Sequence, residues 1–284
     1  MYKTIASVLL CSALSAQAQQ APPDTAKKPV YGWKKNMVAG LTLTQVSFKD
    51  WQQGGEDALA WTVTLDGKAE NDQAKTTWTT SYKFAYGQTK LGDQGIRKTD
   101  DKIDLETVLT YKLGSLVNPY AAATLKTQFA KGFDYASDPD TAVSNFFDPA
   151  YLTQSAGFGY QPLPQLKTRL GVALREIITS DFNSFTNNPA TEQVEKTKTE
   201  GGMESVTNVD WKLAANLLFT AKIELFAAFK NFDEVIVRSD NTLAAKVSKY
   251  VTVNLNVQLI NEKKVTPRTQ VKETIAIGLS YAIL

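Results

Sequence analysis

Charged side chains recur at every second position in several segments of this chain. Lys167, Arg169 and Arg175 are in phase with one another, and so are Lys222 and Glu224. In a β-strand this spacing places the charges on one face, where they line a water-filled passage or pair with charges on other strands. Paired carboxylates at such spacing also suit general acid–base catalysis, so the partners that catalysis needs must be sought.

Those partners are missing. The 284 residues contain no histidine and one cysteine, which removes the commonest general base and the usual zinc ligands. Asp104 and Glu106 share a face as a paired-carboxylate candidate, but carboxylates beside lysines inside a barrel are more often structural ion pairs. The aspartates within residues 134–148 lack EF-hand spacing. The sequence therefore predicts a protein that is not an enzyme, with no catalytic residue, no metal site and no cofactor.

Composition and charge narrow the class of protein. Hydrophobic residues make up 43% of the chain and charged residues 21%, which is too apolar for a disordered chain. Lys and Arg number 31 against 29 Asp and Glu, so the net charge of +2 provides no basic surface for nucleic acid. We expect a folded protein with no nucleic-acid partner.

The first segment has the pattern of a signal peptide over residues 1–18. Lys3 supplies the positive charge, an apolar stretch follows, and Ala16-Gln17-Ala18 fits the cleavage rule. Cys11 is alternatively a lipidation site, although its apolar neighbours fit that chemistry badly. Residues 19–36, rich in Pro and Lys, then form a periplasmic leader. Past the signal, no apolar run is long enough for a membrane-spanning helix.

From Met37 onward the hydrophobic period is two, which predicts strands. The last segment shows it plainly, because Ile275, Ile277, Leu279 and Tyr281 alternate with small or polar residues. About twelve such segments can be placed. They span residues 37–49, 57–70, 75–88, 99–113, 118–132, 151–161, 165–178, 202–214, 217–230, 234–246, 249–261 and 270–284.

The connections between these segments differ in length. Five are short, whereas those around 88–98, 132–150 and 178–201 are long and polar; the short connection at 231–233 breaks the rule. Long strands with short turns at one end and longer loops at the other predict a transmembrane antiparallel β-barrel of about 12 strands over residues 37–284. The turns would be periplasmic and the loops would face outward. The alternative is a soluble β-sandwich or lipocalin-like barrel, in which the charges form the solvated outside.

On the barrel interpretation, the polar face lines the lumen. The lumen-lining candidates are Asp66, Lys68, Lys83, Asp104, Glu106, Lys126, Lys167, Arg169, Arg175, Lys222, Glu224 and Arg238. Aromatic residues fall near both ends of the apolar faces, as expected for the two girdles of a membrane barrel. The girdle candidates are Trp78, Tyr111, Tyr160, Trp211 and Tyr281 at the periplasmic end, and Trp61, Tyr86, Phe129 and Phe229 at the outer end.

Several motifs resemble a known family. Asp50-Trp51-Gln52-Gln53-Gly54-Gly55-Glu56, Arg97-Lys98-Thr99-Asp100-Asp101, the segment 127–135 and Gly278-Leu279-Ser280-Tyr281 together resemble the Bacteroidota family known as domain of unknown function 3078. The likeness runs from Gly32 to Leu284 and implies an outer-membrane barrel of unassigned activity. Such barrels commonly end in an aromatic residue that the assembly machinery reads. This chain departs from that pattern with Ile283 and Leu284, which affects recognition and not the fold.

The lumen charges leave two functions open. One is a small passive channel or transport pore, biased toward anions by the basic row of Lys167, Arg169 and Arg175. The other is a plugged structural or interaction barrel, in which the charges pair and the outer loops present a surface to a ligand or envelope partner. For the channel, our first choice, the expected partners are outer-membrane lipid, the barrel-assembly machinery and a small solute. The expected location is the outer membrane of a Gram-negative bacterium.

Overall fold

A computed structural model describes residues 31–49, 52, 55–137 and 139–283 of the chain. The predicted signal peptide, the predicted leader up to residue 30 and part of the motif at 50–56 lie outside the described residues. Within them, almost all regular structure is β-strand, apart from one turn of 3-10 helix at Asn183–Phe185.

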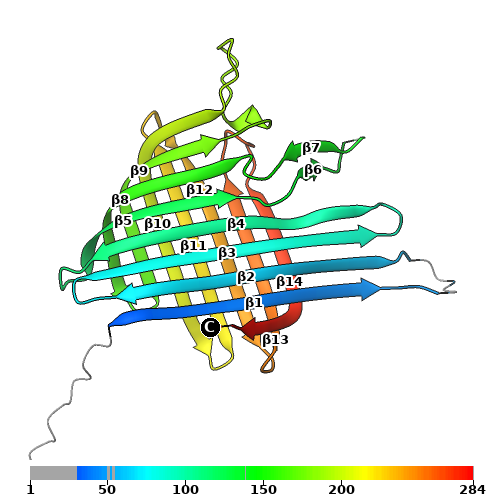
Figure 1. Ribbon diagram of the computed structural model, residues 1–284, viewed down its shortest axis with the longest axis horizontal. Coiled ribbons are helices and arrows are strands. Elements are labelled where there is room, and N and C mark those ends of the chain that lie inside the picture. The colour runs from blue at the N-terminus through cyan, green and yellow to red at the C-terminus, as the bar shows by residue number, and fades with distance from the viewer. Residues whose placement is uncertain (1–30, 50–51, 53–54, 138, 284) are drawn as a thin grey trace, which may run out of the picture. The chain divides into compact units, whose positions relative to one another are not determined.

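Twelve strands form the main sheet and two more form a separate hairpin (Figure 1). The main strands are β1 (Gly32–Val46), β2 (Ala58–Asp72), β3 (Thr76–Leu91), β4 (Ile96–Tyr111), β5 (Val117–Thr127), β8 (Ala150–Leu163), β9 (Leu166–Ile178), β10 (Thr197–Ala214), β11 (Leu217–Ala228), β12 (Asn231–Lys246), β13 (Val251–Asn261) and β14 (Gln270–Ala282). The hairpin is β6 (Gly132–Asp134) with β7 (Thr141–Ser144).

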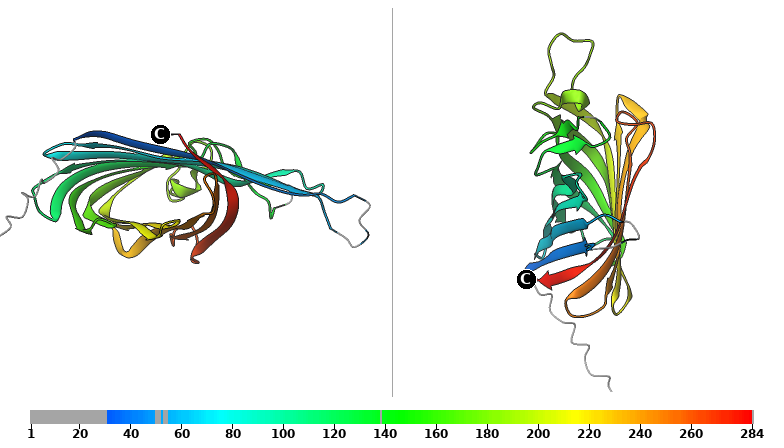
Figure 2. Two further views of the ribbon diagram at one scale, coloured as in Figure 1. Left: turned by 90° about the horizontal axis from the view of Figure 1, so that it is seen from below. Right: turned by 90° about the vertical axis from the view of Figure 1, so that its right-hand side faces the viewer.

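The twelve strands close into a barrel in which every neighbouring pair is antiparallel. Sequential strands are neighbours, except that β5 pairs with β8 because the hairpin β6–β7 lies in the connection between them. This confirms the predicted all-β, twelve-stranded antiparallel barrel. Seen from below in Figure 2, the barrel is flattened, so that its two broad walls lie close together.

The two ends of the barrel differ as predicted. At one end, which we call the turn end, β1 begins, β14 ends, and the connections are short: 73–75, 112–116, 164–165, 215–216 and 247–250. Gly114 takes a φ of 74° in one of these turns, a backbone conformation that favours glycine. At the opposite end, the loop end, the connections are 47–57, 92–95, 128–149, 179–196, 229–230 and 262–269.

Several predicted boundaries need correction. The strands predicted at 118–132 and 202–214 are β5 at Val117–Thr127 and β10 at Thr197–Ala214. The connection expected around 88–98 shortens to 92–95, because β3 and β4 continue their pairing across a bulge near Gly87. The first strand begins at Gly32 rather than Met37 and so includes the end of the predicted leader. β1 and β3 are longer than predicted because charged residues near the barrel rims, such as Lys34 in β1 and Lys90 in β3, interrupt the apolar alternation.

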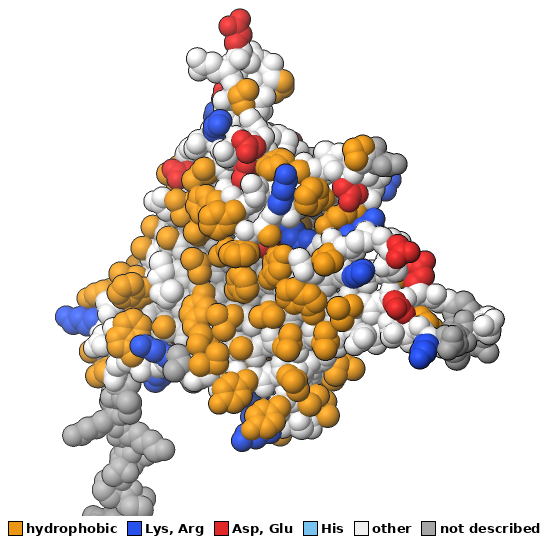
Figure 3. Space-filling model, turned by 45° about the vertical axis from the view of Figure 1, so that its right-hand side comes forward, with side chains coloured by type: hydrophobic (Ala, Val, Ile, Leu, Met, Phe, Trp, Pro, Cys, Tyr) orange, Lys and Arg blue, Asp and Glu red, His pale blue; other side chains and the backbone are white. Residues whose placement is uncertain are grey.

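Side-chain burial is inverted relative to a soluble protein. Ile275 on the outer face of β14 is 77% exposed, whereas Glu106 and Arg169 inside the barrel are each only 7% exposed. Apolar side chains cover the outer wall in Figure 3, and charged ones gather toward its margins. A soluble barrel would expose the charges and bury the apolar residues, so this distribution fits a wall that faces lipid.

No helix among the described residues has the length and apolar character needed to cross a membrane.

The closure between β1 and β14 is incomplete. The two strands pair only from Val38 to Thr42, opposite Ala282 to Gly278, whereas β1 pairs with β2 along its whole length. Toward the loop end, β1 to β3 run on past the point where β14 turns away (Figure 1). Along the seam between β1 and β14, the strands are therefore paired near the turn end and unpaired toward the loop end.

Candidate functional site

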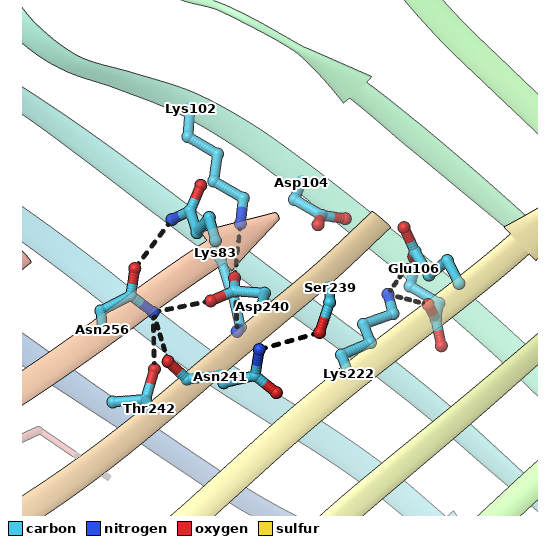
Figure 4. A network of polar contacts seen from close by, with 12 residues as sticks. Lys83, Lys102, Asp104, Glu106, Lys222, Ser239, Asp240, Asn241, Thr242 and Asn256 are labelled. Atoms are coloured by element: carbon cyan, nitrogen blue, oxygen red, sulfur yellow. Dashed lines mark hydrogen bonds and ion pairs between the residues drawn. The ribbon is translucent and has the colours of Figure 1, made fainter. Parts of the chain in front are cut away.

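The lumen is crossed by an ion pair between opposite walls. Lys102 Nζ of β4 lies 2.9 Å from Asp240 Oδ2 of β12. In the closed strand order, β4 and β12 are separated by five strands on either side. Because these strands face each other across the barrel, the pair spans the lumen rather than neighbouring strands (Figure 4).

Asp240 is held by further partners from other parts of the wall. Lys83 Nζ of β3 lies 3.5 Å from the same carboxylate oxygen, and the Asn256 amide on β13 donates to Asp240 Oδ1 at 2.7 Å. Both residues point into the lumen toward Asp240 in Figure 4. One carboxylate thus joins β3, β4, β12 and β13.

A second set of ion pairs lies beside the first. Glu106 of β4 binds Arg169 of β9 at 2.8 Å and also binds Lys222 of β11. Lys222 lies 3.0 Å from Glu224, and Glu224 in turn pairs with Lys126 of β5. We call these five residues, together with Lys83, Lys102 and Asp240, the ion-pair belt. The belt links both broad walls of the flattened barrel.

Local sequence explains how Arg169 is placed. A side chain added at Gly171 would meet the Ala156 carbonyl at 2.2 Å and the Tyr120 hydroxyl at 2.7 Å, so only glycine leaves room there. Tyr120 is therefore able to lie against β9, and the Arg169 guanidinium lies 5.6 Å from the centre of its ring. Stacking of this kind favours arginine and fixes the direction from which it reaches Glu106.

A third cluster, which we call the Glu262 clamp, joins two arginines to one carboxylate. Arg175 Nη2 of β9 donates to Glu262 Oε1 at 2.9 Å, and Arg238 Nη2 of β12 donates to Glu262 Oε2 at 3.0 Å. Glu262 is the first residue of the loop 262–269 and is only 6% exposed. Burial raises the pKa of its carboxyl, but the two guanidinium groups lower it more, so the pKa lies below the ordinary glutamate value.

A cavity of about 580 Å³ lies above the belt, toward the loop end. Its lining includes Lys102, Asp240 and Glu224 from the belt, and Arg238 and Glu262 from the clamp. Phe133, Tyr135 and Phe185 from the loop-end connections also contribute. We call this cavity the outer chamber. Its mixture of both charge signs with aromatic rings suits small polar solutes rather than apolar ones.

The two central motifs of the family resemblance meet beside the chamber. Asp101 of β4 accepts hydrogen bonds from the backbone N–H groups of residues 129–130 at 2.7 and 2.8 Å, and pairs with Lys98 at 2.7 Å. The backbone N–H of Lys98 donates to the Tyr135 hydroxyl at 2.9 Å, and the Arg97 guanidinium lies over the same ring. These contacts fix the hairpin β6–β7 at the loop end.

Most predicted lumen residues lie in the belt or the clamp, namely Lys83, Glu106, Lys126, Arg169, Arg175, Lys222, Glu224 and Arg238. Asp104 lies 4.0 Å from Lys126. Asp66 is opposite Lys83 in the strand register, and Lys68 pairs with Glu70 toward the turn end. Lys167 is exposed, two residues before Arg169.

The basic row of Lys167, Arg169 and Arg175, expected to bias permeation toward anions, is largely paired with carboxylates. Of its three members, Arg169 is neutralised by Glu106 and Arg175 by Glu262. The alternation correctly places the residues on one face, but a strand pattern does not show which carboxylates approach from other strands. In this state, two of the three charges do not face open solvent.

Three charged residues of the belt and the clamp, Lys102, Asp240 and Glu262, were not among the predicted lumen-lining residues. Lys102 is in phase with Asp104 and Asp240 is in phase with Arg238, so the alternation itself contained the signal. Glu262 lies in a connection, where no periodicity marks which way a side chain points. No sequence signal identifies it.

The aromatic candidates lie near the strand ends at which they were placed. Trp78, Tyr111, Tyr160, Trp211 and Tyr281 are exposed near the turn end, and Phe129 and Phe229 are exposed near the loop end. Trp61 and Tyr86 are half-buried against each other, with ring centres 5.7 Å apart. The Trp78 indole donates to the Thr107 hydroxyl at 2.7 Å, which satisfies two polar groups on the outer face.

No cluster of three or more potential metal ligands occurs among the described residues. Asp138, one of the aspartates of the predicted loop, lies outside them.

Two family models match the chain. One, described as a protein of unknown function, DUF3078, matches residues 43–133; the other, described as a protein of unknown function, DUF481, matches residues 148–283. The resemblance to the first family was expected from Gly32 to Leu284, so the match confirms it over the first part of the barrel only. The second part matches a different model. No curated protein matches the sequence.

Solved structures of outer-membrane barrels are similar to the chain at low sequence identity. The COG4313 outer membrane channel from Pseudomonas putida F1 has 10% identity and a TM-score of 0.40, covering 93% of this chain and 99% of that one. The translocator domain of the autotransporter NalP from Neisseria meningitidis has 12% identity and a TM-score of 0.38, covering 90% of each chain. The NanC porin has 10% identity and a TM-score of 0.38, covering 87% of this chain and 98% of that one.

Proposed function

We propose that the protein is an outer-membrane barrel that binds small polar solutes in its outer chamber and whose lumen is closed to free diffusion by the ion-pair belt. The observation that carries this proposal is the Lys102–Asp240 pair between opposite walls. Ions held by several partners in a partly buried site stay together, because separating them leaves a charge without compensation. The chain has no histidine, so we propose solute binding rather than catalysis.

The proposed location is the outer membrane of a Gram-negative bacterium, with lipid around the barrel and the barrel-assembly machinery as the partner during insertion. The apolar outer wall, the polar interior and the predicted signal peptide support it. The test is gel migration of the purified protein with and without boiling, together with extraction of membranes. A folded barrel should migrate differently when unboiled and should require detergent for extraction. Release as a soluble monomer would contradict the location.

The closed lumen is tested by solute entry into liposomes that contain the protein. We expect liposomes with the wild-type protein to swell no faster than protein-free liposomes in a solution of a small sugar. The double variant E106Q/D240N loses two carboxylates that hold the walls together and should admit the sugar. D233N, at an exposed position near the start of β12, is the matched control and should behave like the wild type.

The passive channel of the sequence analysis is the alternative outcome of this experiment. Swelling by the wild-type protein, at a rate that falls as the solute grows, would support a passive pore and overturn the closed lumen. Swelling confined to E106Q/D240N would support the belt as the barrier.

A further inference from the structure

Two guanidinium groups lie over one aromatic ring beside the outer chamber. The Arg175 and Arg238 guanidinium carbons are 5.2 and 5.0 Å from the ring centre of Tyr151. Both arginines donate to Glu262, each to its own carboxylate oxygen. The donors therefore form a fixed fork above an aromatic surface, with room for one planar anion between them.

One hydrogen-bond donor of this fork, Arg175 Nη1, is unused within the described part of the chain. Arg175 is only 5% exposed, and its Nη1 atom is buried without a hydrogen-bond partner among the described residues. Glu200 Oε2 lies 3.9 Å from this nitrogen, which is beyond hydrogen-bond distance. A buried donor without a partner costs folding free energy. Glu262 therefore does not satisfy every hydrogen-bond donor of this site.

The clamp also separates two cavities. Arg238 and Tyr151 line both the outer chamber and a second cavity of about 50 Å³, and Arg175 lines the second cavity only. Glu262 lines only the outer chamber. Its carboxylate therefore stands between solutes in the chamber and the buried Arg175.

We propose that Arg175 and Arg238 form a binding site for the carboxylate group of a small solute, and that Glu262 occupies this site when no solute is bound. This inference rests on the proposed function in one respect, the access of solutes to the outer chamber. A solute carboxylate would replace the Glu262 carboxylate oxygen for oxygen. Displaced from the arginines, Glu262 would leave with the loop 262–269. Other polar contacts of this loop are the pair of Lys264 with Glu200 at 3.0 Å and the hydrogen bond that Asn261 donates to the Thr269 hydroxyl at 2.8 Å.

The geometry selects the ligand class. Among the described residues, Glu262 is the carboxylate that accepts hydrogen bonds from both arginines, and Glu200 lies 3.9 Å from Arg175. Two cationic donors in this arrangement suit an anion rather than a metal cation. The flat Tyr151 ring beneath the fork suits a planar carboxylate. Since Glu262 is tethered next to the site, it competes at a high effective concentration. A free carboxylate should therefore bind the wild-type protein at least about tenfold more weakly than a variant that lacks Glu262.

The experiment uses acetate as the probe and the E262A variant as the receptor. The midpoint of thermal unfolding of the full-length barrel in detergent is followed as sodium acetate replaces sodium chloride at constant total salt. We expect acetate to raise the midpoint of E262A, to raise that of the wild type only at about tenfold higher concentration, and to leave R238M/E262A unchanged. E192A, which alters an exposed loop glutamate, is the matched control and should respond like the wild type.

The folded state of each variant is checked by its migration before boiling, and E262Q replaces E262A if the alanine variant does not fold. An unchanged midpoint of folded E262A or E262Q in acetate would overturn the anion site. Equal responses of E262A and R238M/E262A would also overturn it, because the effect would then not depend on the arginine fork.

These results are separable from a failure of the proposed function. Liposomes that swell with wild-type protein would overturn the closed lumen and leave the acetate response of E262A standing. A wild-type protein that stays closed, together with an E262A variant that ignores acetate, would overturn the anion site alone.

Discussion

Lys102 and Asp240 face each other from opposite walls of the barrel, with 2.9 Å between the ammonium nitrogen and the carboxylate oxygen. Their strands are as far apart in the closed sheet as two strands can be. A contact of this kind requires a flattened barrel, as Figure 2 shows. The pair is therefore both a consequence of the flattening and an interaction that maintains it.

Removing the carboxylate of Asp240 should destabilise the barrel. D240N leaves Lys83 and Lys102 without their shared partner, and the loss of one member of a partly buried pair costs about 1–3 kcal/mol. Urea unfolding in lipid vesicles measures this difference in the free energy of unfolding. The double variant K102M/D240L removes both charges of the pair and should recover part of the loss. Equal stability of D240N and the wild type would show that the pair contributes nothing.

The Asp101 contacts should control access to the loop-end hairpin. D101A removes two hydrogen bonds to the backbone at residues 129–130 and the ion pair with Lys98. We expect proteolysis between residues 128 and 149 to be about tenfold faster or more, because charge-assisted hydrogen bonds of this kind hold a segment closed. The barrel strands should remain protected. D93N, at an exposed position in the β3–β4 connection, is the control, and equal cleavage of D101A and D93N would contradict this role.

The Glu262 clamp should keep its stabilising contribution to a lower pH than a glutamate with an ordinary pKa would. Because the pKa of Glu262 is lowered in the folded protein, its stabilising contribution is complete above the unfolded pKa near 4.3 and is lost as the pH falls below it. The stability difference between wild type and E262Q should therefore stay constant from about pH 7 to pH 5 and shrink under more acidic conditions. Unfolding midpoints across this range measure it. A difference that disappears already near neutral pH would contradict the clamp.

The seam between β1 and β14 should be closed near the turn end and open near the loop end. A cysteine pair at Leu41 and Leu279, which are register partners, should form a disulfide under mild oxidation. A pair at Gln45 and Ile275, beyond the paired segment, should not. Gel migration under non-reducing conditions distinguishes the two. Efficient cross-linking of both pairs would show that the barrel closes along the whole seam.

The strands could be predicted from the sequence because the wall of a membrane barrel has only two kinds of surroundings. Each residue faces either lipid or lumen, so the apolar period of two marks almost every strand directly. The segment predicted at 165–178 appears as β9 at Leu166–Ile178. Errors arose at the rims, as at Gly32, where side chains leave the lipid and the alternation loses its physical cause.

The pairing of the lumen charges could not be predicted from the sequence in the same way. Alternation places Glu106 and Arg169 on lumen faces, but the shape of the closed barrel decides which strands approach one another across it. Glu262 is a further case, because its position inside the barrel follows from the path of a loop. A strand pattern carries no information on either point.

Single-channel recording in planar lipid bilayers tests whether the ion-pair belt closes the lumen. We expect no stable open-pore current from correctly folded wild-type protein at neutral pH, and discrete conductance steps from E106Q/D240N under the same conditions. A wild-type barrel that conducts steadily, with steps equal to those of E106Q/D240N, would show that the belt does not close the lumen.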